Sequence, residues 1–207
     1  MTHSAHRFGS KASLNNDYTI YARTSRHVNR EGCGPKLRKI LEIFLSENPV
    51  NFGSSHAGNS YASGLKIEEY AESLDNAYGV CCSFSSRESV KRVLKKLKEA
   101  NLGISIVVSG LIDDVKSMAR EIGTTPHTAL LSLGIHGDTS LLPEDRVLEI
   151  TTMCGHGMVA TRQVEHVMGE VQAGEMSPED GAQLLAQPCP CGIFNVDRCC
   201  NILEELK

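Results

Sequence analysis

Three cysteines in two short segments have the residue types and the spacing for metal or redox chemistry. Cys154 precedes a Gly-His-Gly turn in "MCGHGM", and Cys189 and Cys191 flank a proline in "QPCPCG". A deprotonated thiol is a ligand for soft metals and a nucleophile toward disulfides. The proline holds its two neighbouring thiols within a narrow range of separations. We therefore treat the two segments as parts of one candidate site.

The first 32 residues contain no continuous apolar stretch of the kind that forms a secretory leader. The sequence therefore predicts a cytoplasmic protein, in which thiols stay reduced and the eight cysteines are not expected to form disulfides. In a reducing compartment, unevenly spaced cysteines favour metal binding or thiol chemistry.

The spacing of the cysteines bears on the kind of metal, because the sequence has no Cys-x-x-Cys pair. Structural zinc often uses such close pairs, whereas the cysteine ligands of iron–sulfur clusters can come from scattered loops. We predict a [4Fe-4S]-type cluster held by Cys154, Cys189 and Cys191, with zinc as the alternative metal. A third interpretation needs no metal: Cys154 attacks a disulfide, and Cys189 or Cys191 resolves it.

The fourth ligand has two candidates. Cys33 lies just before a predicted helix, where free backbone amides stabilise a thiolate. Cys81 and Cys82 are neighbours in a predicted strand, so their side chains point to opposite faces of the sheet and only one can reach a given site. We select Cys33 or Cys82 to complete the metal site. Cys199 and Cys200 fit the apolar face of a C-terminal helix and are expected to pack in the core.

Three histidines are candidates for acid or base chemistry. His156, two residues after Cys154, is our first choice for proton transfer, because histidine titrates near neutral pH. A helix-capping role suits it equally well. His136, beside Asp138 in a glycine-rich turn, and His56, in a serine- and glycine-rich loop, are further catalytic candidates at the rim of the site.

The elements that must position these residues follow from the apolar patterns. Helical spacing recurs over 35–48, 86–100 and 113–122. The run "YTIYAR" is typical of an edge strand, and four later apolar runs are also typical of strands. The four runs are 76–84, 104–110, 128–135 and 146–153. The run at 104–110 is apolar enough to be buried on both faces. We expect an α/β domain whose mixed sheet of four or five strands is flanked by helices.

The chain divides by pattern into three parts. Residues 1–17 are polar and predict a mobile tail. Residues 18–157 form the α/β domain, and residues 158–207 form a lobe of three helices that carries the Cys-Pro-Cys loop. A helix over 158–173 would run ~24 Å away from Cys154, and one over 178–187 would return ~15 Å. The lobe therefore has a suitable size to bring the loop back over Cys154.

Composition limits the class of function. The net charge of −4 gives no reason to expect a nucleic-acid partner, and no apolar run is long enough to cross a membrane. The sequence lacks the motifs of P-loop, dinucleotide-binding, zinc-protease and radical enzymes. We predict an oxidoreductase or a cluster-dependent lyase that acts on a small molecule or receives electrons from a donor protein. The sequence is also compatible with a homo-oligomer.

Overall fold

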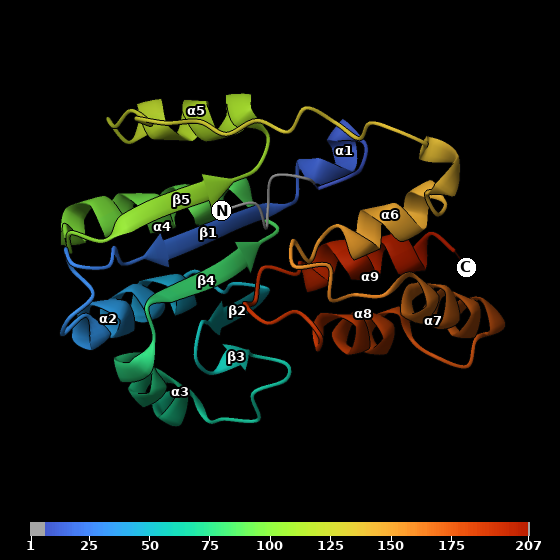
Figure 1. The fold of residues 1–207 in the computed structure, drawn as a ribbon, viewed down its shortest axis with the longest axis horizontal. Helices are drawn as coiled ribbons and strands as arrows, with labels where there is room; N and C mark the ends of the chain where they lie inside the picture. The colour runs from blue at the N-terminus through green and yellow to red at the C-terminus, as the bar shows by residue number, and fades with distance from the viewer. Residues whose placement is uncertain (1–6, 207) are drawn as a thin grey trace.

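The computed structural model describes residues 7–206, whose strands form one five-stranded antiparallel sheet in the order β3, β2, β4, β1, β5 (Figure 1). The strands are β1 (Tyr18–Arg23), β2 (Asn51–Ser54), β3 (Gly58–Asn59), β4 (Gly79–Phe84) and β5 (Ser105–Ser109). The α/β class with flanking helices is confirmed, but the sheet is not mixed, because each pairing is antiparallel.

The position of β1 explains this difference. A helix connects β4 to β5, as in a parallel unit, but β1 lies between these two strands and runs against both. β1 is therefore an interior strand, whereas the sequence predicted an edge strand. β5 is an edge strand that is only partly buried, although its apolar sequence predicted burial on both faces.

One face of the sheet packs against the helices found between residues 34 and 121. These are α2 (Gly34–Leu45), α3 (Ile67–Ser73), the short helix η1 (Leu74–Asn76), α4 (Arg87–Ala100) and α5 (Ile112–Glu121). Residues alternate along a strand, so Ile20 of β1 and Cys82 of β4 both enter this first core. α2, α4 and α5 lie close to their predicted ranges, because their apolar residues recur at helical spacing, as in Val90, Val93 and Leu97 of α4.

The other face of the sheet meets a layer of four helices within the described residues. α7 (Thr161–Ala173), α8 (Pro178–Ala186) and α9 (Val196–Glu204) confirm the predicted C-terminal helices, and α6 (Asp145–Thr151) joins them. Their apolar side chains form a second core that includes Cys81 of β4 and is edged by Tyr21 of β1. None of the helices that the structure describes has the length and apolar character needed to cross a bilayer.

Two predicted strands are absent from the described chain. Residues 128–135 are irregular and exposed, followed by a short helix, η2 (Thr139–Leu141), and most of 146–153 forms α6. A short apolar run does not by itself distinguish a strand from a buried helix. Val147 and Ile150, three residues apart, both face the second core, which is the helical spacing.

The segment before β1 is packed against the C-terminal helices. It contains a short helix, α1 (Lys11–Leu14), and the buried residue Asp17. The prediction of a mobile tail covered residues 1–17. Residues 1–6 lie outside the described chain. From Arg7 onward, buried ion pairs hold the segment in place, and this packing differs from the predicted mobile tail.

Candidate metal centre

Four thiols from three separate segments meet between the sheet and the helical layer. Cys81 comes from β4, Cys154 follows α6, and Cys189 and Cys191 lie between α8 and α9. Cys189 lies close enough to Cys154 and Cys191 to interact electrostatically with both, and Cys191 interacts in the same way with Cys81. The helical layer therefore folds the Cys-Pro-Cys segment back onto Cys154, as its length allows.

Three of the four thiols are buried, and the fourth is partly exposed. The exposed fractions of Cys189, Cys154 and Cys81 are 0%, 2% and 4%. Cys191 is half-buried, and the neighbouring His156 is exposed. The Nδ1 atom of His156 lies 3.7 Å from the Sγ atom of Cys191. Access from solvent thus leads to Cys191 and His156.

Backbone amides point at two of the sulfur atoms. The N–H groups of His156 and Met158 hydrogen-bond to Sγ of Cys154, and those of Cys191 and Phe194 hydrogen-bond to Sγ of Cys189. An N–H donor stabilises a thiolate more than a thiol. Such donors are the usual second layer around cysteine sulfurs that bind metals.

Mutual contact gives the thiols opposite tendencies to ionise. Hydrogen bonds from Cys154 and Cys191 hold the pKa of Cys189 well below its ordinary value. The hydrogen bond to Cys189, and after it burial, raises the pKa of Cys154. Contacts with Cys189 and Cys81, and after them burial, raise the pKa of Cys191. Closely spaced thiolates repel each other, so ionising the whole group requires a cation among them.

Two glycines allow the Cys-Pro-Cys segment to lie against the sheet. A Cβ atom at Gly192 would overlap the backbone of Phe52 and Gly53 in β2, and one at Gly53 would overlap the backbone of Cys191 and Gly192. Gly192 also has a φ of +75°, which L side chains rarely adopt. The close approach of the two backbones sets Cys191 beside β4.

Buried polar side chains of the sheet hold the same segment. The Nδ2 atom of Asn59 donates to the carbonyl oxygens of Gln187 at 3.1 Å and of Cys189. Asn51 donates to the carbonyl of Phe194 at 3.1 Å, and the Ser83 hydroxyl donates to the same oxygen at 3.3 Å. These bonds satisfy carbonyls that would otherwise be buried without a partner.

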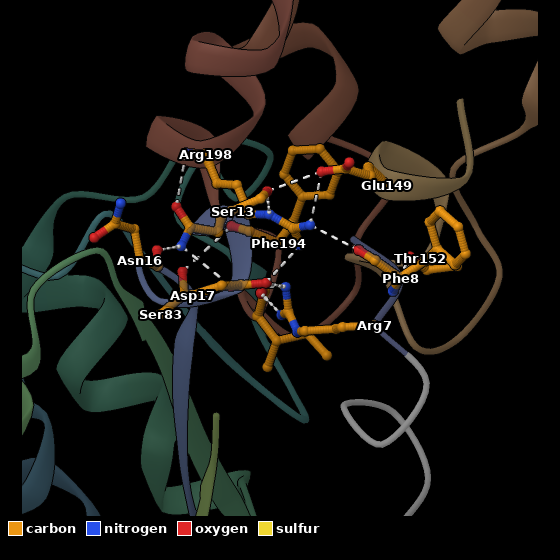
Figure 2. Close-up of polar contacts among 12 residues, drawn as sticks. Arg7, Phe8, Ser13, Asn16, Asp17, Ser83, Glu149, Thr152, Phe194 and Arg198 are labelled. Carbon is orange, nitrogen blue, oxygen red and sulfur yellow. Dashed lines mark hydrogen bonds and ion pairs between the residues drawn. The ribbon is translucent and has the colours of Figure 1, made fainter. Parts of the chain in front are cut away.

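Figure 2 shows a charged network that fixes the end of the segment. Arg7 and Arg198 donate to the carboxylate of Asp17 at 2.6 and 2.8 Å. The amide of Asn195 donates to Asp17 at 3.1 Å, and Arg7 also donates to the carbonyl of Ile193. The N-terminal segment, α9 and the residues after Cys191 are thereby tied together.

The two candidates for a fourth ligand lie elsewhere. Cys33 is buried in the first core, where its thiol donates to the carbonyl of Ala77 at 3.5 Å. Cys82 also faces the first core, and its thiol lies 3.8 Å from the carbonyl of Ile20. The residue that reaches the group is Cys81, which sequence reasoning did not select. Alternation placed one of the two neighbours on each face, but it did not tell which face the helical layer covers.

The three candidate histidines are separated in space. His156 contacts the thiol group, as described above. His136 lies in the exposed connection after α5, with Nε2 2.8 Å from the carbonyl of Leu133. His56 is exposed in the turn between β2 and β3. Of the three predicted histidines, His156 lies beside Cys191, whereas His136 and His56 lie elsewhere.

The spacing of the thiols differs from that of a single-ion site. Four thiolates around one zinc ion would lie about 3.8 Å from one another, given the usual Zn–S distance. Among residues 7–206, the set of three or more ligand atoms found within 4.8 Å of one another consists of Glu179, Cys200 and Glu204 on the surface. The four thiols are thus linked pairwise in a chain and do not converge on one point. The all-sulfur donor set is of the kind that iron–sulfur clusters use, and zinc uses it as well.

Comparison of the chain with protein-family models, with curated proteins and with solved structures finds no match. The function must therefore be inferred from the centre itself.

Proposed function

We propose that this protein binds a [4Fe-4S]-type cluster through Cys81, Cys154, Cys189 and Cys191 and serves as a cytoplasmic redox protein. The observation that carries the proposal is the meeting of four thiols from three distant segments. Soft thiolate donors are the ligands that such clusters and zinc select. Glycines, asparagines and a buried ion-pair network hold the segment that supplies two of the thiols.

The amide donors support a thiolate role for these cysteines. Four N–H groups are directed at Cys154 and Cys189. Hydrogen bonds to the sulfurs raise or lower the potential of a bound cluster, which is one of the protein's means of tuning redox chemistry. The absence of a Cys-x-x-Cys pair, with ligands drawn from three separate segments, favours a cluster over a single zinc ion.

The number of thiols favours electron transfer over lyase chemistry. A lyase needs an iron without a protein ligand, at which the substrate binds. The presence of Cys81 beside Cys191 supplies a ligand for each of four irons. A bound cluster would take up and release electrons while remaining held by all four cysteines, so an electron-donor protein is the partner that this site calls for.

The alternative thiol–disulfide activity is less well supported. A disulfide substrate must reach the attacking sulfur. Cys189, whose pKa is lowered, is completely buried, and Cys154 is nearly so. Cys191 is the accessible thiol of the group, and its pKa is raised. The most ionised thiol and the most accessible thiol are therefore different residues.

The proposal is tested by purifying the protein without oxygen, recording its visible spectrum and measuring iron, sulfide and zinc per chain. We expect a brown protein that contains iron and sulfide in equal amounts. Cys154→Ala should lose both, whereas Cys199→Ala, which removes a buried thiol from the same core, should retain them. Colourless protein with stoichiometric zinc, or equal iron in both variants, would refute the proposal.

A further inference from the structure

Tyr21 connects the thiol group with the surface at one end of the sheet. It lies directly opposite Cys81 in the pairing of β1 with β4, so both side chains are on the face toward the second core. Gly79 leaves room for the Tyr21 ring, because a Cβ atom there would lie 2.7 Å from a ring carbon. The ring thus extends from the buried cysteine along the strand toward Arg23.

Aromatic rings and guanidinium groups continue this connection outward. Nη1 of Arg23 donates to the Tyr21 hydroxyl at 3.0 Å. The Arg23 guanidinium carbon lies 5.8 Å from the centre of the Tyr21 ring and 5.2 Å from that of Tyr78. Arg30 lies 4.9 Å from the centre of the Tyr78 ring. These distances are typical of cation–π contacts.

The segment 23–33 at this end of the sheet contains three arginines and one carboxylate, Glu31. Arg23 ends β1, and Arg26 and Arg30 lie in the β1–α2 connection. None of the carboxylates in residues 7–206 forms an ion pair with these arginines. The buried Nε atom of Arg30 also lacks a hydrogen-bond partner within that range. In a chain of net charge −4, three arginines without acidic partners form a distinct positive surface.

The position of this surface leaves it open to a macromolecule. β1 points away from α6–α9, so the connection that follows it lies at the end of the sheet opposite the helical layer (Figure 1). Arg26 is exposed, and 37% of Tyr78 is accessible. We name the surface made by Arg23, Arg26, Arg30 and Tyr78 the arginine–tyrosine surface.

We propose that the arginine–tyrosine surface is the docking site for an acidic electron-carrier protein that exchanges electrons with the centre through the Tyr21 side. This inference rests on the proposed function, because it names the partner of that centre. In each encounter the reduced carrier would lose one electron and the centre would gain one, with no atom transferred. Arginines without ion-pair partners attract an acidic carrier and speed its association. Tyr21 lies between Arg23 and Cys81, on the path from the docked carrier to the centre.

The test measures binding of an acidic plant-type ferredoxin by calorimetry at about 0.02 M and about 0.3 M salt. We expect binding that weakens steeply with salt. The double variant Arg26→Glu and Arg30→Glu should weaken binding at low salt about tenfold or more. The control, Lys95→Glu with Lys116→Glu, changes the net charge equally at two exposed lysines on α4 and α5 and should stay within about twofold. Thermal melting should show that both variants are folded.

A second measurement follows reduction of iron-loaded protein. The arginine variant should be reduced more slowly by ferredoxin but at an unchanged rate by reduced methyl viologen, which needs no docking surface. Equal effects of the two double variants, salt-independent binding, or binding of a single-stranded oligonucleotide in place of ferredoxin would overturn the docking proposal. Ferredoxin binding by a protein that holds zinc would overturn the proposed function and leave the docking surface standing.

Discussion

Cys81 and Cys82 are adjacent in β4, yet they have unrelated surroundings. Cys81 faces the helical layer and contacts Cys191, whereas Cys82 faces the first core and contacts a carbonyl of β1. The period of two along a strand is the cause. Adjacent residues of the same type thus form a matched pair, in which one is a proposed ligand and the other is a packing residue.

Replacing each of the two by serine tests the assignment of the fourth ligand. Cys81→Ser should reduce the iron content and change the cluster spectrum, because a serine oxygen is a poorer ligand for this site. Cys82→Ser should lower the free energy of unfolding by about 1–3 kcal/mol, since it buries a hydroxyl in an apolar core, and should leave the iron content unchanged. Loss of iron in Cys82→Ser but not in Cys81→Ser would show that the fourth ligand is Cys82, on the opposite face of the sheet.

Sequence reasoning at the residue scale identified the segments but not the complete set. Cys154, Cys189 and Cys191 were recognisable because glycine or proline stands beside each of them. Cys81 was hidden because a cysteine in an apolar strand also fits a core. Its function depends on which face of the sheet the helical layer covers, and this is a property of tertiary packing.

At the scale of elements, the position of the Cys-Pro-Cys segment depends on close contact with β2. Gly192 and Gly174 have nearly equal φ values of +75° and +76°, so alanine at either position suffers similar backbone strain. A Cβ atom at Gly192 would overlap the backbone of β2, whereas one at Gly174 would meet no atom within 4 Å. Comparing the alanine variants at Gly192 and Gly174 therefore separates the cost of backbone strain from the cost of steric overlap.

We expect Gly174→Ala to cost about 1 kcal/mol of unfolding free energy through strain alone. Gly192→Ala should cost about 2 kcal/mol more, because overpacking displaces the backbone, and it should also reduce the iron content. Chemical denaturation and iron analysis of both variants provide the measurement. Equal stability of the two variants would mean that β2 does not constrain the segment.

A pH-dependent contact joins the end of α2 to α4. Burial raises the pKa of Glu47, but hydrogen bonds from Lys96 and Arg92 outweigh it and leave the pKa below its ordinary value of 4.5. A carboxyl whose folded pKa is lowered stabilises the protein above its unfolded pKa, and this contribution is lost as the pH falls. Both cations are largely exposed, which reduces the effect.

Glu47→Gln should therefore lower the free energy of unfolding by about 1 kcal/mol at pH 7. The difference between this variant and the wild type should shrink as the pH falls below 4.5. Urea unfolding of the variant and the wild type, at pH 7 and at a pH below 4.5, measures this difference. A difference that grows on acidification would have the wrong sign for a lowered pKa.

The helices were predictable from sequence, and the strands were less so. Val90, Val93 and Leu97 repeat at a spacing that only a helix buries on one face. Residues 128–135 and 146–153 have the apolar character of strands, yet one is an exposed connection and most of the other is α6. Strand pairing depends on distant partners, so a short apolar run does not determine it.

At the scale of the whole molecule, a buried charge network connects the two ends of the chain. Asp17, directly before β1, pairs with Arg198 of α9 and with Arg7, and the exposed fractions of the Asp17 and Arg198 side chains are 0% and 2%. Removing one partner of a buried pair leaves the other charge without compensation. The network therefore holds the helical layer to the sheet near the centre.

Asp17→Ala should lower the free energy of unfolding by about 3–5 kcal/mol. Glu205→Ala, which removes an exposed pair with Arg146, should cost less than about 1 kcal/mol. Urea denaturation of the two variants tests this contrast. A small effect of Asp17→Ala would show that the N-terminal segment contributes little to the assembly of the sheet and the helices.

The central claim is that four cysteines hold an iron–sulfur cluster between the sheet and the helical layer. Native mass spectrometry of anaerobically purified protein tests it most directly. We predict a mass about 350 Da above that of the chain, as expected for four irons and four sulfides, and loss of this increment in Cys81→Ser. An increment of about 65 Da, as for one zinc ion, or an increment unchanged in Cys81→Ser, would contradict the claim.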